Sequence, residues 1–275
     1  MSREIPSKIE KYNIEALPIE IGGTEIILQR HGKYERSADS QNVGSLTEEG
    51  AEEISNLSKE FFDKLFVQIP EDERDRVDIL VIGSDTQFME GGRRSMETAD
   101  LVTEALKEKL KELKLDENQL LNAYGRYSGE GGVRPTPKLR EPQMFENSMG
   151  FVNFLREKYG DLGKDFWIAF EEDLEKETRE KMEAEGPDEI ADRLKFMIEV
   201  LARYSRMYHK KNPDRRLVIW AATHYDTISP YTKREIFNVG KEVPLAVDYG
   251  AGISIIIDPE GNATTKIEGE EYEIL

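Results

Sequence analysis

Two arginines and two histidines stand either at the ends of apolar stretches that have the composition of buried strands or at the start of a helical pattern. Arg30 and His31 end the stretch IILQRH, and His224 ends LVIWAATH far along the chain. Arg94 begins a helical pattern shortly after the apolar stretch VDILVIG. An arginine fork matches the oxygens of a phosphoryl group, and a neutral imidazole is a competent nucleophile toward phosphorus. If the fold brings these side chains together, they indicate phosphoryl chemistry.

The elements that would position these residues alternate along the chain. Short apolar runs predict strands, and apolar residues at helical spacing predict the helices between them. Such alternation predicts an α/β domain with a largely parallel sheet, in which ligands sit beyond the carboxyl ends of the strands. Both arginines and both histidines then meet at one edge of the sheet. The expected strands cover 24–29, 77–83 and 217–224, and the expected helices follow Ser45 and cover 92–113 and 188–209.

Local signals mark where some elements begin and turn. Ser45 and Glu48 stand at the spacing of a capping box, which predicts that Ser45 caps the first long helix. The segments 253–257 and 264–267 flank the turn sequence DPEGN, which predicts a β-hairpin.

Residues 122–186 interrupt the alternation and are predicted to form an insertion or cap. The first part is rich in glycine, proline and arginine, and a loop of that length is usually functional or disordered. The acidic stretch 170–185 is predicted to form a solvated helix, because opposite charges recur at i,i+4 spacing. These pairs are Glu172/Lys176, Glu175/Arg179 and Glu177/Lys181.

The composition narrows the class of protein. The 275 residues include 38% hydrophobic residues, enough for a sizeable core, and we expect a single domain over residues 1–275. A formal charge of −18 argues against nucleic acid or an anionic membrane as the main partner, but screening by salt still permits a small anionic ligand. Cysteine is absent, and no H-E-x-x-H spacing occurs, so we expect neither a metal nor another cofactor. Without a secretory signal or a long apolar run, the chain is expected to be soluble and cytoplasmic.

An ordered set of short motifs runs from about residue 24 to residue 257 and resembles the histidine phosphatase superfamily, the phosphoglycerate-mutase-like proteins. The motifs are Arg30-His31-Gly32, Leu46-Thr47-x-x-Gly50, Gly83-Ser84-Asp85, Arg94-Ser95-Met96-Glu97-Thr98-Ala99 and Thr223-His224. The resemblance implies a three-layer α/β/α sandwich with a mostly parallel central sheet. It also implies a transient phosphohistidine at His31, with Arg30, Arg94 and His224 holding the phosphoryl oxygens.

The acid that protonates the leaving oxygen has three candidates. The mutase-like branch of the superfamily uses a glutamate in an L-x-E segment, which Leu139-Arg140-Glu141 matches, so Glu141 is the first choice. The other branch places an aspartate directly after the second histidine. Here Tyr225 intervenes, and Asp226 is therefore the second choice. Asp85 is the third.

Departures from the mutase pattern favour a phosphatase. The mutases have an asparagine where this chain has Ser37, and their tryptophan-containing stretch is replaced by SADSQNVGSLT. We therefore expect hydrolysis of a small phosphorylated substrate, with a phosphomutase or a non-catalytic phospho-ligand binder as alternatives. Arg36 is either a further phosphate contact or an exposed loop residue, and Arg93 is expected to face away from the site, because adjacent helical residues do not share a face.

Overall fold

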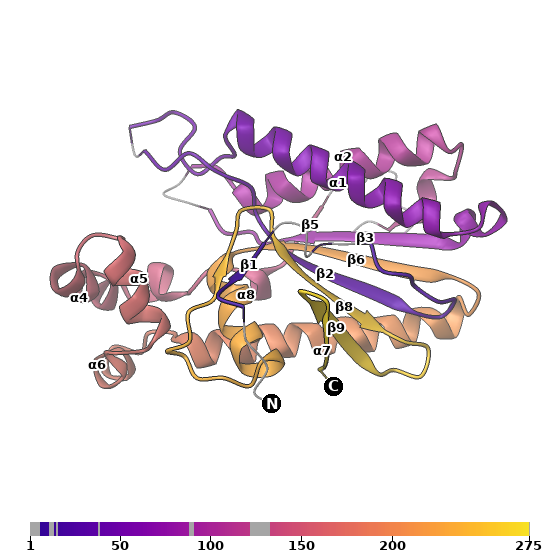
Figure 1. The fold of residues 1–275 in the computed structure, drawn as a ribbon. Helices are drawn as coiled ribbons and strands as arrows, with labels where there is room; N and C mark the ends of the chain where they lie inside the picture. Colours follow the sequence, from indigo (N-terminus) through magenta and orange to yellow (C-terminus); the bar gives the residue numbers. More distant parts are fainter. Residues whose placement is uncertain are drawn as a thin grey trace.

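The computed structural model describes residues 6–10, 14, 16–37, 39–87, 91–121 and 133–274. The fold is mixed α/β with a mostly parallel central sheet, as the alternation of elements predicted (Figure 1). Among the described residues, eight strands form this sheet, in the order β10-β9-β8-β2-β6-β3-β4, with β5 also paired to β3. Their bounds are β2 Thr24–Arg30, β3 Val77–Gly83, β4 Leu120–Leu121, β5 Arg134–Pro135, β6 Arg216–Thr223, β8 Gly252–Ile257, β9 Ala263–Ile267 and β10 Glu270–Glu273.

The register of the central strands decides where the polar residues meet. The strand β2 pairs with β6 in parallel, and Arg30 stands opposite Thr223 at the last rung. The strand β3 flanks β6 on its other side, also in parallel, and Gly83 stands opposite Ala222. The carboxyl ends of three strands therefore coincide at one edge. The predicted hairpin is confirmed, since β8 and β9 pair antiparallel, and a separate short ladder joins β1 (Lys8–Ile9) to β7 (Ala246–Val247).

Helices cover both faces of the sheet. In Figure 1, α1 and α2 lie above the sheet, α7 lies below it, and α4, α5 and α6 gather beyond one end. The helices are α1 Glu48–Gln68, α2 Arg94–Glu112, α3 Met144–Asn147, α4 Met149–Tyr159, α5 Lys164–Glu171, α6 Lys176–Lys181, α7 Pro187–Lys211 and α8 Tyr225–Tyr231. A π-helical turn covers Thr232–Ile236, and 3-10 turns cover Glu71–Arg76, Glu117–Gln119 and Pro137–Leu139.

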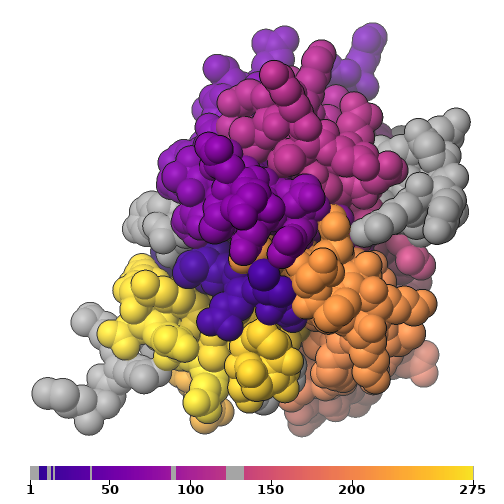
Figure 2. Space-filling model, turned by 90° about the vertical axis from the view of Figure 1, so that its right-hand side faces the viewer, coloured from indigo at the N-terminus to yellow at the C-terminus, as the bar shows by residue number. Residues whose placement is uncertain are grey.

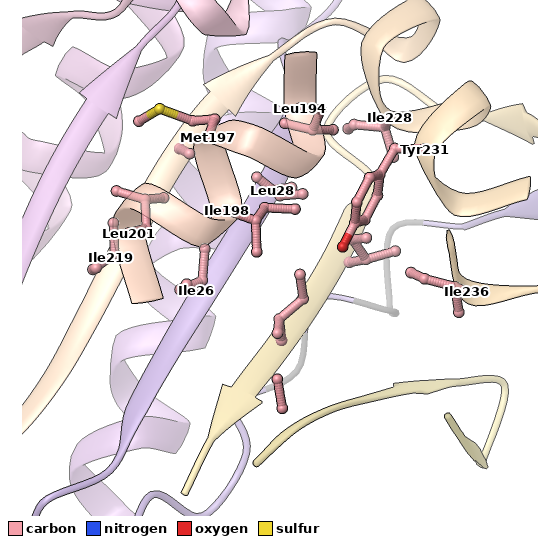
Figure 3. Packing of buried hydrophobic residues seen from close by; sticks show 14 of the residues in the cluster. Ile26, Leu28, Leu194, Met197, Ile198, Leu201, Ile219, Ile228, Tyr231 and Ile236 are labelled. Carbon is pink, nitrogen blue, oxygen red and sulfur yellow. The ribbon is translucent and has the colours of Figure 1, made fainter. Parts of the chain in front are cut away.

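Two apolar clusters hold the helices on the sheet. On the lower face, Leu194, Ile198 and Leu201 of α7 pack over Ile26 and Leu28 of β2, and α8 adds Ile228 and Tyr231 (Figure 3). On the upper face, Phe61 and Phe62 of α1 surround Trp220 of β6, with ring centroids 4.8 Å apart for Phe61 and Trp220. Because neighbouring strand residues point to opposite faces, the apolar residues of the buried strands supply both clusters.

The end of the sheet where β2 and β6 begin is closed by short connections. Figure 2 shows the indigo N-terminal segment between the orange end of α7 and the yellow C-terminal hairpin. There the amide of Gly22 donates to the carbonyl of Arg215 over 2.9 Å, and Pro259 packs beside Gly22. The loops that can carry function therefore lie at the opposite end, where the parallel strands finish.

The structure corrects the predicted cap of the first long helix. Thr47, not Ser45, is the N-cap of α1, and its hydroxyl accepts a hydrogen bond from the amide of Gly50 over 3.0 Å. Ser45 stays in the preceding loop, where its carbonyl accepts from the amide of Glu35. Glu48 is then the first residue of the helix, so its side chain does not occupy the position that a capping box requires.

The acidic stretch 170–185 also differs from the prediction. It forms the end of α5 and the short helix α6, separated by a turn in which Asp173 has a φ of 55°. The expected i,i+4 partner of Glu175 was Arg179, but Arg179 is buried and binds Asp173. Glu175 instead contacts Lys158 and Tyr159 of α4. The charged side chains of this stretch therefore pair with residues outside the expected i,i+4 pattern, and the stretch is not one solvated helix. The insertion 122–186 stays a prediction, and its residues 122–132 lie outside the described residues.

Candidate active site

The ends of β2 and β6 bring the two histidines together. The amide of His31 continues the ladder by donating to the carbonyl of Thr223 over 2.9 Å, and His224 follows immediately. The imidazole centroids lie 5.1 Å apart, and both side chains are buried. Parallel pairing in register thus converts two distant sequence positions into one pair of neighbouring rings.

The geometry around His31 assigns its tautomer. Its Nδ1 lies 2.8 Å from the carbonyl of Gly32, so Nδ1 carries the proton and donates it. The other nitrogen, Nε2, accepts from Nε of Arg94 over 3.0 Å. Burial lowers the pKa of His31 well below its ordinary value, and the charges of Arg94 and His224 lower it further. The residue is therefore a neutral imidazole with its lone pair on Nε2.

Arg94, the first residue of α2, connects the other candidates. Its Nη2 donates to Oε2 of Glu141 over 2.6 Å and lies 3.4 Å from Nδ1 of His224. Its side chain is buried, whereas the adjacent Arg93 is exposed, as the helical spacing predicted. One guanidinium thus contacts the proposed nucleophile, the first-choice acid and the second histidine.

Two serines determine the orientation of His224. Its Nε2 lies 2.9 Å from Oγ of Ser84 and 3.3 Å from Oγ of Ser95, while Nδ1 faces the guanidinium of Arg94. Because a guanidinium only donates, Nδ1 accepts and Nε2 carries the proton. Ser84 and Ser95 belong to the G-S-D and R-S-M motifs, and their contacts with His224 give both motifs a physical role.

The glycines of two motifs allow close packing beside the nucleophile. A Cβ on Gly32 would lie 2.8 Å from Ile54, and a Cβ on Gly50 would lie 2.2 Å from the carbonyl oxygen of Lys33. The start of α1 therefore packs against the backbone that follows His31. In addition, the amide of Gly32 donates to the hydroxyl of Thr98 over 3.1 Å. These contacts fix the position of the imidazole relative to α2.

Glu141 reaches the cluster from the segment that follows the turn Pro137–Leu139. Thr223 donates to the carbonyl of Leu139 over 2.7 Å, and Thr227 donates to the carbonyl of Arg140 over 2.9 Å. The Glu141 side chain is 16% exposed, so it lies at the border between the cluster and solvent. Burial raises the pKa of Glu141, while the charge of Arg94 acts in the opposite direction. This carboxyl group has both the position and the raised pKa that a general acid needs.

The two other acid candidates have different environments. Asp85 accepts two hydrogen bonds from Arg140, at 2.6 and 2.9 Å, and this pairing lowers the pKa of Asp85. The structure therefore does not bring Asp85 into the cluster as an acid. Asp226 is buried at the start of α8, and burial together with the nearby charge of Glu141 raises the pKa of Asp226 to about 8.

Arg30 and Arg36 lie at the outer side of the cluster with two tyrosines that the sequence analysis did not single out. The guanidinium of Arg30 lies 3.8 Å from the ring centroid of Tyr249 and donates to the carbonyl of Val247 over 2.5 Å. The ring of Tyr34 lies 5.2 Å from that of His31. The exposed Arg36 donates to the hydroxyl of Tyr249 over 2.5 Å. No periodic signal marks these tyrosines, because they come from loops.

Within the described parts of the chain, no group of three or more histidine, cysteine, aspartate or glutamate side chains could hold a metal ion. The same residues include no helix that is long and apolar enough to cross a membrane.

Comparison with known proteins supports the fold. No family model matches the sequence, and no curated protein matches it. The solved structure of phosphoglycerate mutase from Bacillus anthracis str. Sterne is similar, with 18% identity over 90% of this chain and 93% of that chain, at a TM-score of 0.50. A mycobacterial glucosyl-3-phosphoglycerate phosphatase has 15% identity over 89% of this chain and 98% of that chain, at a TM-score of 0.44. The chain has the phosphoglycerate-mutase-like fold.

Proposed function

We propose that the chain is a histidine phosphatase that hydrolyses small phosphomonoesters through a phosphohistidine at His31. The observation that carries the proposal is the contact of 3.0 Å between Nε of Arg94 and Nε2 of His31, with Glu141 bound to the same guanidinium. Nucleophile, anion-binding group and acid are thus assembled at one point. The similarity in fold to a phosphoglycerate mutase supports the same reaction class, since an enzyme of that name acts on a phosphorylated substrate.

When a phosphoryl group binds, its oxygens take over the N–H that Nε of Arg94 donates to Nε2 of His31, and the lone pair on Nε2 is released. In the first step, this lone pair attacks phosphorus and the bond to the leaving oxygen breaks. The leaving oxygen takes the proton of the Glu141 carboxyl group. Arg94 and Arg30 balance the charge of the phosphoryl oxygens, and Nδ1 of His31 keeps its proton through the carbonyl of Gly32. Since His31 is neutral before attack, no proton has to leave it first.

Binding of the phosphoryl group prepares the acid. In the unliganded protein, burial raises the pKa of Glu141 and the guanidinium of Arg94 limits this rise. A bound phosphoryl group would compete for this guanidinium and bring negative charge close to the carboxylate. Both effects raise the pKa of Glu141 and favour the protonated form that the first step requires.

In the second step, the ionised Glu141 takes a proton from water while the water oxygen attacks phosphorus. The bond between phosphorus and Nε2 of His31 breaks, and phosphate leaves. His31 returns to its neutral form and Glu141 regains its proton. The same carboxyl group therefore serves both half-reactions, and atoms and charges balance over the cycle.

The test is release of inorganic phosphate from a panel of phosphomonoesters by the wild-type chain and by His31→Ala. We expect turnover by the wild type and a loss of at least about a thousandfold in the variant, roughly 4 kcal/mol of barrier. Turnover that survives in His31→Ala would overturn the proposal. Transfer that depends on a bisphosphorylated primer, without release of phosphate, would identify a phosphomutase instead.

A further inference from the structure

A buried arginine on α7 binds the backbone of the segment that carries Glu141. Nη1 of Arg193 donates to the carbonyl oxygens of Lys138 and Arg140, over 3.0 and 2.8 Å, and Nη2 lies 3.4 Å from the carbonyl oxygen of Glu141. The side chain of Arg193 is only 6% exposed. A single guanidinium thus donates to three carbonyl groups along a segment that begins in the 3-10 turn Pro137–Leu139 and continues without regular secondary structure to Glu141.

Glu185 holds this arginine in place. Its carboxylate accepts from Nε of Arg193 over 2.8 Å and from Nη2 over 3.1 Å, which is the bidentate geometry that fixes the plane of a guanidinium. The same carboxylate accepts from the amide of Gln143 over 2.7 Å. The pair therefore binds the chain on both sides of Glu141. It also neutralises the buried charge of Arg193 without using the side chain of Glu141.

The segment 138–141 is held from three directions. Thr223 and Thr227 bind the carbonyls of Leu139 and Arg140 from the end of β6 and from α8. Arg193 supplies the third direction, from α7. A misplacement of about 1 Å can cost roughly a hundredfold in rate. These hydrogen bonds therefore matter most for the carboxyl group of Glu141, which must reach the leaving oxygen.

We propose that Arg193, oriented by Glu185, is a positioning residue that sets the Glu141 carboxyl group for proton transfer to the leaving oxygen. The inference rests on the proposed function, since it assigns Arg193 a part in that reaction. Arg193 acts through backbone carbonyls and has no contact with His31 or Arg94 among the described residues. It therefore acts on the acid through the backbone. At the histidine pair it acts only through its charge, which helps to lower the pKa of His224 and which a lysine would retain.

The chain offers a matched control in Arg179. This residue is equally buried and makes a bidentate pair with Asp173, at 2.7 and 3.1 Å. Its other contacts are the carbonyl of Ala184 and the carboxylate of Glu189, and none reaches the segment 138–141. Replacing Arg179 therefore reproduces the loss of a buried arginine pair without removing any hydrogen bond that Arg193 or Glu185 makes to the segment.

The experiment measures single-turnover phosphorylation by glycerol phosphate and by 4-nitrophenyl phosphate in Arg193→Lys and Arg179→Lys. Lysine keeps the charge but cannot hold Glu185 and three carbonyls together. We expect Arg193→Lys to slow glycerol phosphate roughly tenfold to a hundredfold and to leave the nitrophenyl ester nearly unchanged, because its leaving group departs without a proton. Arg179→Lys should show no such difference. Equal slowing of both esters by Arg193→Lys, or the same leaving-group dependence in Arg179→Lys, would overturn the inference.

A second readout separates this inference from the proposed function. If the wild type released phosphate from no ester, the proposed function would fail, but the titration of Glu141 by carbon-13 NMR would still test the positioning. With the signal assigned through Glu141→Gln, Arg193→Lys should move the pKa of Glu141 toward its ordinary value, since burial is the main cause of the raised pKa. Glu185→Gln, a milder change that preserves shape, should move it in the same direction. An unchanged titration in both variants would overturn the inference.

Discussion

The Nε of Arg94 lies 3.0 Å from Nε2 of His31, so the arginine donates to the unprotonated imidazole nitrogen, the one that would attack phosphorus once a phosphoryl group takes over this N–H. The contact keeps the lone pair of His31 directed toward the place where a guanidinium would bind phosphoryl oxygens. It also keeps the imidazole neutral, because the adjacent positive charge lowers the pKa of His31. Nucleophile activation and anion binding thus depend on the same side chain.

Arg94→Lys tests the double contact. A lysine ammonium group keeps the charge but cannot reach Nε2 of His31 and Oε2 of Glu141 in the geometry of the guanidinium. We expect kcat/KM for a phosphomonoester to fall by roughly 10²–10³-fold. Arg93→Lys is the control, since Arg93 is exposed beside it and should retain nearly full activity. If Arg93→Lys lost activity and Arg94→Lys retained it, Arg94 would have no part in the reaction.

Glu141→Gln and Asp226→Asn identify the acid. If Glu141 protonates the leaving oxygen, its glutamine variant should slow glycerol phosphate by roughly 10²–10⁴-fold and slow phosphorylation by 4-nitrophenyl phosphate much less. The nitrophenyl ester should then give a burst, because hydrolysis of the phosphohistidine also needs this carboxyl group. Asp226→Asn should produce neither effect. A leaving-group dependence in Asp226→Asn alone would transfer the role to Asp226.

The pH dependence of the rate should follow the acid. A general acid works only while protonated. The rate of turnover of an alkyl phosphate should therefore be highest below the raised pKa of Glu141 and fall as the pH rises through this pKa. At acidic pH the rate should decline because His31 becomes protonated and cannot attack. This decline should lie well below pH 6.5, because the pKa of His31 is strongly lowered. Rate profiles of the wild type and Glu141→Gln test this, and an alkaline limb that persists unchanged in the variant would contradict it.

Glu25 makes the stability depend on pH in a predictable direction. It lies buried in β2, and burial raises its pKa to about 8, while interactions with Ser254 and the backbone of Leu17 act in the opposite direction. The unfolded chain loses this proton near the ordinary value of 4.5, so the free energy of unfolding is greatest below that pH and decreases as the pH rises toward about 8. The total change is on the order of a few kcal/mol.

Glu25→Gln should remove this dependence. Denaturant titrations should show the variant more stable than the wild type near pH 8 and similar to it at acidic pH. Glu260→Gln, at an exposed position in the turn between β8 and β9, is the control and should follow the wild-type curve. A Glu25→Gln variant that loses stability equally at all pH values would show that the carboxyl group is not buried in its protonated form.

The parts of the structure that follow from local pattern were predictable from the sequence. The strands β2, β3 and β6 are short apolar runs, and their parallel pairing places His31 and His224 side by side without further information. The cap of α1 was not predictable in the same way. Two residues with hydroxyl groups, Ser45 and Thr47, stand near its start, and only the path of the preceding loop selects Thr47.

The supporting residues could not be predicted, because their contacts are long-range and belong to no periodic pattern. Arg179 stands at helical spacing from Glu175, yet it turns inward to bind Asp173 across a left-handed turn. Arg193 lies on α7, whose apolar positions were recognisable in the sequence. Its proposed role depends on contacts with residues 138–141, and no sequence pattern indicates that this segment lies beside α7. Tyr34 and Tyr249 come from two separate loops and meet beside His31, with their ring centroids 6.3 Å apart.

The most direct test of the account is to trap the phosphoryl group on the protein. Wild-type chain mixed with substrate and quenched in alkali within the first turnover should carry a phosphoryl group that is stable to base and labile to acid. Mass spectrometry of the peptides should place it on His31. Glu141→Gln should accumulate more of this species, because hydrolysis of the phosphohistidine is slowed. A phosphoryl group on another residue, or turnover without any trapped group on His31, would contradict the account.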